Sequence, residues 1–229
     1  GLGDVYKRQG LVLVLLLRGG SSDPAVQQGL ARRILNTLTG LGPCFIKLGQ
    51  ALSTRPDLVR RDWLEELTRL QDDLPAFPHA TALACIREEL GAPAEELFEE
   101  FPDTPIAAAS LGQVYKARLQ GQHWVAVKVQ RPNLTFILRR DLVLIRALGV
   151  MTAPLLPLNL GFGLGGIIDE FGRSLFEEID YGLEAANAER FSALFADNDA
   201  VYIPKVERML SSTRVLTTTW IDGAKMRDS

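Results

Sequence analysis

Apolar residues recur three or four positions apart through the first hundred residues, which is the period of an α-helix. After the cap pair Asp23–Pro24, four such residues share one helical face: Val26, Leu30, Ile34 and Leu38. The pattern predicts helices over residues 23–40, 43–54, 62–71 and 79–90, followed by a short acidic turn over 94–100. We therefore expect this part of the chain to be helical.

The pattern changes after two prolines, Pro102 and Pro105, where short alternating apolar stretches replace the helical period. Gly121 lies between two such stretches and predicts a β-hairpin. The sequence predicts strands over residues 114–119, 123–130, 201–206 and 213–218, and helices over 133–150 and 166–195. A segment rich in proline and glycine, 154–165, separates the two helices. We infer a domain boundary between residues 104 and 105.

Both ends of the chain depart from this organisation. The apolar run Leu11–Leu17 is much shorter than the roughly 20 residues that a bilayer-spanning helix needs. It is either the tail of a truncated membrane-proximal helix or a core segment. Residues 4–9 (DVYKRQ) resemble the translation of a sequencing adapter, and residues 227–229 resemble another frame of it. We therefore expect residues 1–20 and 227–229 to be non-native or truncated ends.

Composition excludes several classes of protein. The 229 residues are 47% hydrophobic and 23% charged, which excludes wholesale disorder, collagen-like repeats and coiled coils. A net charge of -3 argues against a general nucleic-acid binder. The cysteines and histidines lie singly, without the spacing of a zinc site or a disulfide framework: Cys44, Cys85, His79 and His123. We expect buried thiols, surface imidazoles and no metal site among them.

One lysine stands in a chemically suggestive place. The stretch Val125–Lys128 puts Lys128 on a predicted strand, one hairpin after the small-residue turn Ala107–Gly112. In kinases a lysine on this strand contacts the α- and β-phosphates of ATP and pairs with a glutamate on the next structural helix. An amphipathic edge strand that simply ends in lysine is the alternative.

The predicted helix 166–195 carries a run of acidic residues: Glu177, Glu178, Asp180 and Glu184. On a continuous helix Glu178 and Glu184 would lie about 120° apart around the axis and about 9 Å apart along it. One lysine could not serve both, so two basic partners or a metal ion would be needed. A solvated acidic helix face is the alternative interpretation.

Four motifs occur in the order that one family shows. They are Lys47–Gln50 (KLGQ, its KxGQ motif), Ala107–Val114 (its alanine-rich loop), Val125–Pro132 (VAVKVQRP) and Glu178–Tyr181 (its ExD motif) with Glu184–Asn187. Over residues 30–225 the chain resembles the UbiB family of atypical kinase-like proteins, also called ADCK or aarF-domain kinases. An unrelated α+β protein would instead place Lys128 and Glu184 beyond ion-pair distance.

The resemblance implies an α+β fold. Residues 105–226 would form a protein-kinase-like small lobe, with a short antiparallel sheet and an αC-type helix. A helical extension over residues 21–104, carrying the KxGQ motif, would precede it. The large lobe would follow Gly223 and is absent from the chain.

The resemblance also implies roles for residues. Lys128 would contact phosphate with Glu184 as its partner, and Lys47 would pair with the carboxylates of Glu178 and Asp180. Lys47 and Gln50 would then belong to a built-in lid. The implied nucleotide-binding residues are Ala107, Ala108, Ala109, Ser110, Gly112, Lys128, Thr219 and Ile221.

Three of these residues differ from common patterns. Ala108 and Ala109 carry a Cβ where ordinary kinases have glycine, so we expect altered nucleotide selectivity. Residues 219–223 (TWIDG) resemble the family's hinge, where backbone groups would bind adenine. Thr219 stands there in place of a glutamate that is common in relatives, so we expect backbone contacts to survive and infer no role for its side chain. Gly49, inside a predicted helix, indicates a close approach of another element, either across the site or in an ordinary helix-helix contact.

The function implied by the resemblance is binding of ATP or ADP by part of an atypical kinase or ATPase linked to isoprenoid quinone or prenyl-lipid metabolism. The alternative is a non-catalytic pseudokinase scaffold that organises a membrane-associated biosynthetic complex. The catalytic and Mg²⁺-binding aspartates would belong to the absent large lobe, so we expect this fragment to be inert.

The implied partners are a nucleotide, a prenyl lipid or quinone-biosynthesis proteins, and a membrane surface, but no nucleic acid. We expect a membrane-associated protein at the cytoplasmic face of a bacterial membrane, with an organelle as the alternative.

Overall fold

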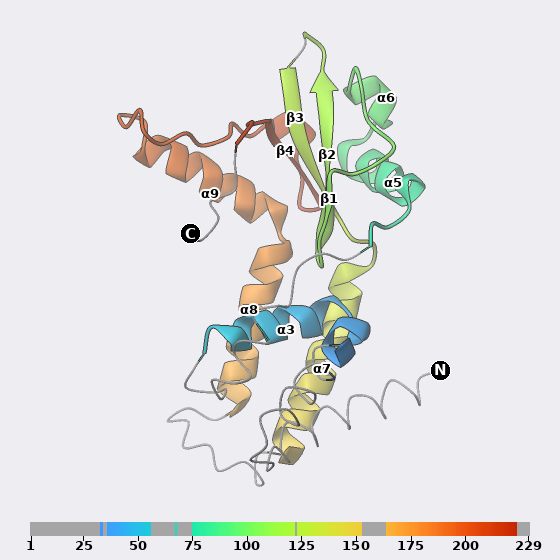
Figure 1. The fold of residues 1–229 in the computed structure, drawn as a ribbon, viewed down its shortest axis with the longest axis vertical. Coiled ribbons are helices and arrows are strands. Elements are labelled where there is room, and N and C mark those ends of the chain that lie inside the picture. Colours follow the sequence, from blue (N-terminus) through green and yellow to red (C-terminus); the bar gives the residue numbers. More distant parts are fainter. Residues whose placement is uncertain are drawn as a thin grey trace. The chain divides into compact units, whose positions relative to one another are not determined.

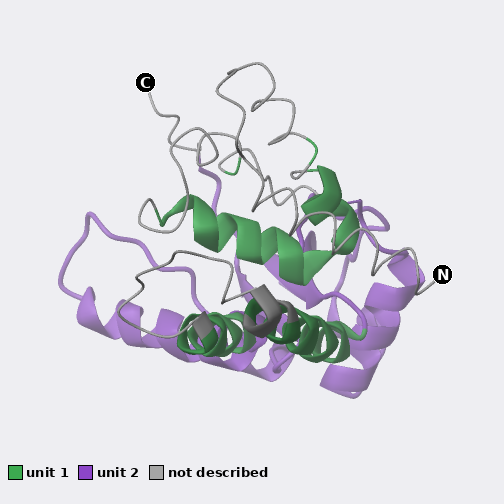
Figure 2. Cartoon of the chain, turned by 90° about the horizontal axis from the view of Figure 1, so that it is seen from below, with its two compact units in different colours: residues 1–72, 133–176 green, residues 73–132, 177–229 purple. Residues whose placement is uncertain are grey.

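The structure is a computed structural model of the chain that describes residues 33, 36–55, 67, 75–121, 123–152 and 164–223. It divides the chain into two compact units (Figure 2). Unit 1 comprises residues 1–72 and 133–176, and unit 2 comprises residues 73–132 and 177–229. Predictions for residues 1–20, 227–229, most of 23–40, and nearly all of 62–71 and 154–165 lie outside the described residues.

The named elements follow one another along the chain (Figure 1). They are α3 (Pro43–Ser53), α5 (His79–Leu90), α6 (Ala94–Leu97), β1 (Ala107–Ala108), β2 (Gly112–Leu119), β3 (His123–Gln130), α7 (Leu134–Thr152), α8 (Leu164–Ile179), α9 (Tyr181–Leu194), the 3₁₀ turn η2 (Arg208–Leu210) and β4 (Val215–Thr219).

Unit 2 is built on an antiparallel sheet of four strands in the order β1-β2-β3-β4. The hairpin predicted around Gly121 joins β2 to β3, and Gly121 adopts the left-handed φ of 90° that favours glycine in such a turn. Its register pairs Gly112 with Gln130 and Leu119 with His123. With the helices around it, this sheet confirms the predicted α+β kinase-like fold.

One face of the sheet forms the core of unit 2. The alternation of β2 and β3 turns every second side chain to this face, where α5 and α6 cover it (Figure 1). Figure 1 also places α9 on the opposite side of the sheet. The buried core consists of Phe77, Ala82, Ile86, Ala94, Phe98, Tyr115, Ala117, Val125, Val127, Val129 and Val215.

Helix α5 confirms the predicted span 79–90, and Gly91 closes it with a φ of 78°. Arg214, just before β4, forms ion pairs of 2.7 Å with both Glu88 and Glu89 of α5. Burial opposes ionisation of Glu89, but hydrogen bonds from Ser212 and Arg214 prevail and lower its pKa. These contacts fasten α5 to the sheet.

Unit 1 packs α3 across α7 (Figures 1 and 2). The buried side of α3 includes Cys44, whose pKa burial raises to about 12. On α7, Asp141 is only 1% exposed, and Arg140 donates two hydrogen bonds to its Oδ1. An ion pair between Arg146 and Asp169 joins α7 to α8. No described helix is both long enough and apolar enough to cross a bilayer.

Two sequence predictions are wrong. The helix predicted over residues 166–195 is two helices, α8 and α9, because Asp180 leaves the helical conformation at φ -87° and ψ 95°. The strand predicted over 201–206 is only an isolated bridge between Val206 and Thr218. Pro204 in that segment has no N–H to donate to a ladder.

The compact units are also divided differently from the predicted domains. Helices α5 and α6 belong with the sheet because Ala82 and Ile86 of α5 lie in its core, while α7 belongs to unit 1. The domain boundary at residues 104 and 105 stays a prediction. His79, expected at the surface, is half-buried, with its ring 5.8 Å from that of Tyr115.

Candidate functional site

The face of the sheet turned away from α5 and α6 carries the candidate site. On β3, Val127 and Val129 point into the core, so Ala126 and Lys128 lie on the opposite face. In the register of the sheet, Lys128 lies between Val114 of β2 and Leu216 of β4. A charged side chain is therefore placed in the middle of three strands and flanked by apolar neighbours.

Lys128 and Glu184 form an ion pair. The Nζ atom of Lys128 lies 2.7 Å from Oε2 of Glu184, at hydrogen-bond distance. The two side chains are 34% and 44% exposed, so their attraction contributes at most about 1 kcal/mol to stability. The ion pair that the family resemblance implied is present, while the contact of Lys128 with phosphate stays a prediction.

Glu184 is held in place by the way α9 begins. Asp180 caps the helix: its Oδ1 accepts hydrogen bonds from the backbone N–H groups of Gly182 (2.9 Å) and Leu183 (3.4 Å). The Tyr181 N–H donates to the carbonyl of Thr213 at 3.1 Å. Because Glu184 lies in the first turn of α9, these contacts fix the carboxylate relative to the sheet.

The break at Asp180 means that Glu178 and Glu184 do not lie on one continuous helix, as was predicted. The 120° angle between Glu178 and Glu184 assumed one continuous helix, whereas Glu178 is in the last turn of α8 and Glu184 in the first turn of α9. The capping role of Asp180 was missed. An aspartate followed by Tyr181 and Gly182 was its sequence signal, since aspartate is among the favoured N-cap residues.

The predicted lid residues Lys47 and Gln50 are both half-buried on α3. They belong to unit 1, whereas Glu178 and Asp180 belong to unit 2. The pairing of Lys47 with these carboxylates, and the lid itself, stay predictions. Gly49 is buried on α3, as expected for a close approach by another element.

The alanine-rich loop is a tight turn between β1 and β2. Ala107 and Ala108 pair with Val114 and Gln113, and the Ala109 N–H donates to the carbonyl of Gly112 at 2.8 Å. Within the turn Ser110 is fully buried. The loop thus has a defined backbone conformation.

Arg131, directly after β3, fastens this loop. Its backbone N–H donates to the carbonyl of Leu111, and its Nε donates to that of Ala109, both at 2.9 Å. Its Nη2 donates at 2.9 Å to the carbonyl of Pro75, before α5. In the sequence, Arg131 was noted only as a member of the motif Val125–Pro132, and no role was predicted for its side chain.

Gly112 lies where the loop, β3 and α9 meet. A Cβ at this position would lie 2.5 Å from the hydroxyl of Tyr181 and 2.6 Å from the carbonyl oxygen of Val129. The Tyr181 hydroxyl is buried without a hydrogen-bond partner in the part of the chain that the structure describes. Burial, followed by the charges of Glu184, Cys85 and Glu178, raises the pKa of Tyr181.

The predicted hinge begins at the end of β4. Thr219 accepts a hydrogen bond of 2.6 Å from the Lys205 N–H at its hydroxyl, and its own N–H donates to the Lys205 carbonyl at 2.9 Å. The Thr219 side chain therefore holds the segment around Lys205, before η2, against the end of β4. Ile221, the other predicted hinge residue, is 42% exposed.

A cation between two indoles fastens the hinge to β2. The Lys116 Nζ lies 5.1 Å from the ring centroid of Trp124 and 4.6 Å from that of Trp220. Trp220 also donates from its backbone N–H to the Trp124 carbonyl, at 2.9 Å, and from Nε1 to Asp222, at 2.7 Å. Sequence patterns did not indicate this arrangement, although Lys116 and Trp124 lie diagonally across the predicted hairpin, on the same face.

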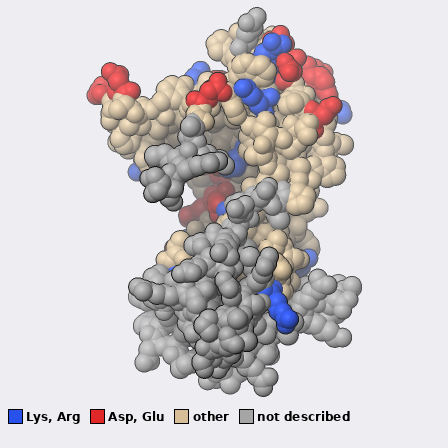
Figure 3. All heavy atoms as spheres, in the orientation of Figure 1, with Lys and Arg blue, Asp and Glu red and all other residues tan. Residues whose placement is uncertain are grey.

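Charge is distributed unevenly over unit 2. Figure 3 shows acidic side chains gathered over α5 and α6, on the side of the sheet away from Lys128. Arg118 of β2 forms ion pairs with Glu99 at 3.2 Å and Glu100 at 3.5 Å. Among the described residues, no three His, Cys, Asp or Glu side chains are grouped as metal ligands.

Comparison with known proteins gives three kinds of match. The family model of the ABC1 atypical kinase-like domain matches residues 69–229. A Synechocystis protein, slr1919, is 51% identical over 199 residues, which are 87% of this chain and 35% of that protein. The Arabidopsis chloroplast protein ACTIVITY OF BC1 COMPLEX KINASE 1 is 48% identical over 199 residues, 86% of this chain and 29% of that protein.

A third relative, a chloroplastic aarF domain-containing protein kinase of Arabidopsis, is 39% identical over 199 residues, 86% of this chain and 28% of that protein. Among solved structures, Rv3197 of Mycobacterium tuberculosis in complex with erythromycin is 34% identical, with a TM-score of 0.54 over 76% of this chain and 44% of that one. The chain spans about a third of the length of these curated relatives.

Proposed function

Because the chain belongs to the ABC1 atypical kinase-like family, which confirms the resemblance to aarF-domain kinases, we propose that it binds an adenine nucleotide on the face of the sheet that carries Lys128. It would be the ATP- or ADP-binding part of an atypical kinase or ATPase linked to isoprenoid quinone or prenyl-lipid metabolism. The ion pair of 2.7 Å between Lys128 and Glu184 carries the proposal.

The residues on this face fit a nucleotide chemically. An ammonium group beside a carboxylate can donate to phosphate oxygens while the carboxylate fixes its direction. Val114 and Ala126 offer apolar surface on the same face to an adenine ring. The Thr219 N–H is already donated to Lys205, so the Thr219 carbonyl and the backbone of Ile221 would bind the edge of the base. The loop Ala107–Gly112 would cover the phosphates.

ATP would supply a phosphoryl group activated by Mg²⁺. The described residues include no grouped metal ligands, so we assign Mg²⁺ to none of them. What this chain contributes is orientation: Lys128 holds phosphate, Glu184 holds Lys128, and Asp180 holds the helix that carries Glu184.

Equilibrium titration with a fluorescent ATP analogue tests the proposal. Lys128→Met should weaken binding about tenfold or more, because a hydrogen bond to a charged group contributes roughly 1.5–3 kcal/mol. Lys205→Met is the matched control, since Lys205 is exposed and its side chain pairs only with Glu207 among the described contacts. Equal affinity of wild type and Lys128→Met would refute the proposal.

The link to prenyl lipids, and to the cytoplasmic face of a membrane, is supported by the motifs that the chain shares with the family. Flotation of the protein with phosphatidylglycerol vesicles, with and without a prenylated quinone, tests both parts. We expect the protein to float with the vesicles and more of it to do so with the quinone. Recovery of all protein at the bottom of both gradients would contradict the link.

A further inference from the structure

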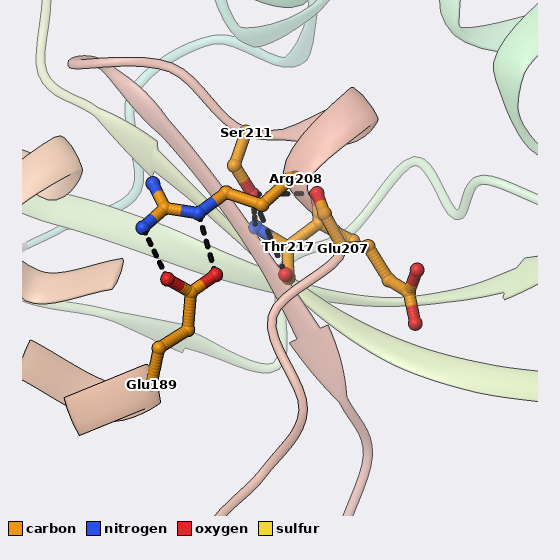
Figure 4. A network of polar contacts seen from close by, with 5 residues as sticks. All are labelled: Glu189, Glu207, Arg208, Ser211 and Thr217. Carbon is orange, nitrogen blue, oxygen red and sulfur yellow. Dashed lines mark hydrogen bonds and ion pairs between the residues drawn. The ribbon is translucent and has the colours of Figure 1, made fainter. Parts of the chain in front are cut away.

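The carboxyl-terminal half of α9 has its own attachment to the sheet. Glu189 receives a two-pronged hydrogen bond from Arg208: Nε donates to Oε1 and Nη2 to Oε2, both at 2.6 Å (Figure 4). These hydrogen bonds lower the pKa of Glu189. A bidentate pair restricts both distance and direction, so it can hold a helix in one orientation.

The segment that carries Arg208 is in turn bound to β4. The Glu207 N–H donates to the carbonyl of Thr217 at 2.9 Å, and the Thr217 N–H donates to the Ser211 hydroxyl at 3.0 Å. Ser211 completes the network by donating to the Glu207 carbonyl at 2.9 Å (Figure 4). Because Thr217 is fully buried within β4, the segment that carries Arg208 is held at a fixed position on the sheet.

The attachment of this segment to β4 lies next to the candidate site in the sheet. Leu216, adjacent to Thr217, pairs with Lys128 across β3 and β4. The contacts therefore form a closed ring: from Lys128 to Glu184, along α9 to Glu189, through Arg208 to β4, and across the sheet back to Lys128. The two side chains through which α9 takes part in this ring, Glu184 and Glu189, lie five residues apart.

Little else attaches this half of α9 among the described residues. From residue 186 to residue 194 every residue is exposed except Ala188, which packs partly against the cluster of Tyr181, Ala185, Val206 and Leu216. After Ala185, the helix is therefore held to the rest of unit 2 mainly by the Glu189–Arg208 pair and the partial packing of Ala188.

We propose that Arg208 is a positioning residue that keeps α9 oriented so that Glu184 stays on Lys128. The effect of Arg208 on nucleotide affinity rests on the proposed function. Its effect on the geometry of the Lys128–Glu184 pair is independent of that function. Both side chains are about half exposed, 48% for Arg208 and 47% for Glu189, so water screens their attraction. We therefore expect the loss of the Glu189–Arg208 pair to change the labelling rate of Lys128, and nucleotide affinity, about three- to fivefold.

Acylation of lysines, read site by site by mass spectrometry, tests the proposal without any nucleotide. An ammonium group held by a carboxylate is shielded from the reagent, so Arg208→Gln should raise the labelling rate of Lys128 about three- to fivefold. Arg173→Gln is the matched control: it removes another exposed arginine–glutamate pair of 2.6 Å, with Glu170 on α8. It should leave the labelling rate of Lys128 unchanged.

Two further variants keep the test decisive. Glu189→Gln breaks the same pair without changing the size of the side chain, and it replaces Arg208→Gln if that variant does not fold. Exchange of the charges in Glu189→Arg/Arg208→Glu should restore the labelling rate of Lys128 toward the wild-type value, which a loss of stability alone would not do.

Titration with the fluorescent ATP analogue gives the second measurement. Arg208→Gln should weaken binding by the same three- to fivefold, and the exchanged pair should recover it. If wild type binds no nucleotide, the proposed function fails. The labelling rate of Lys128 then decides the inference by itself: a rise in Arg208→Gln supports it, and an unchanged rate overturns it. If wild type binds through Lys128 but both labelling and affinity are unchanged in Arg208→Gln and Glu189→Gln, the inference is overturned.

Discussion

Lys128 lies over the ring of Tyr181, with Nζ 4.5 Å from the ring centroid. The same lysine is paired with Glu184, so α9 contacts it through two residues three positions apart. The ring is fully buried, and its hydroxyl points toward Gly112 at the end of the alanine-rich loop. Tyr181 therefore joins three of the sequence motifs at one point.

This arrangement separates the roles of the ring and the hydroxyl of Tyr181. Tyr181→Phe keeps the ring under Lys128 and removes a buried hydroxyl without a described partner, so we expect stability within about 1 kcal/mol of wild type or above it. Tyr181→Leu removes the ring and should cost on the order of 2 kcal/mol or more. Urea unfolding measures both, and a large loss in Tyr181→Phe would show that the hydroxyl has a partner.

Gly112 should tolerate no side chain. Gly112→Ala places a Cβ 2.5 Å from the Tyr181 hydroxyl and 2.6 Å from the Val129 carbonyl, and should cost on the order of 2 kcal/mol in urea unfolding. Adding Tyr181→Phe should restore only part of this loss, because the carbonyl contact remains.

The control for this glycine is Gly166→Ala, on α8. A Cβ there meets no atom of the described residues within 4 Å, so the change should stabilise the helix by about 0.5–1 kcal/mol. Wild-type stability in Gly112→Ala would contradict the packing described around the loop.

Asp180 has two candidate roles that substitution can separate. As the N-cap of α9 it accepts hydrogen bonds through Oδ1, which asparagine can also do. Asp180→Asn should therefore keep the stability of wild type, whereas Asp180→Ala should lose about 0.5–2 kcal/mol in thermal unfolding. If the charge of Asp180 also pairs with Lys47, Asp180→Asn should change nucleotide selectivity at unchanged stability.

Asp141 makes unit 1 sensitive to pH. Burial raises the pKa of its carboxyl, while the hydrogen bonds and the charge of Arg140 oppose that rise without cancelling it. Oδ2 has no hydrogen-bond partner among the described residues. A raised pKa in the folded state means that stability is greatest below the ordinary pKa of about 3.9 and falls as pH rises through the folded-state value.

Asp141→Asn should remove this dependence and be more stable than wild type at neutral pH. Helix unfolding followed by circular dichroism across the acidic range measures the effect. A variant that is less stable than wild type at neutral pH would show that the ionised carboxylate is stabilised in the fold.

Local sequence patterns predicted much of the sheet and α5. The hairpin of β2 and β3 followed from alternation around Gly121, and the two ends of α5 followed from apolar spacing and Gly91. These elements are determined by residues near one another in sequence. The Lys128–Glu184 pair was predicted instead from the resemblance to a known family, because residues 56 positions apart give no local signal.

Sequence patterns failed to predict the structure where tertiary contacts determine the backbone conformation. Residues 166–195 have helical periodicity throughout, but capping by Asp180 and the hydrogen bond from Tyr181 to Thr213 divide them. The attachments made by Arg131 and Arg208 were also missed, because each arginine bonds to groups distant in sequence.

The indole pair that holds Lys116 gives the chain a built-in optical reporter. Trp124 and Trp220 are two of its three tryptophans, and both lie where β3 meets the predicted hinge. Indole emission depends on nearby charge and on contact with water. A displacement of Lys116, or a base stacked near the hinge, would therefore change the intrinsic fluorescence of the unlabelled protein.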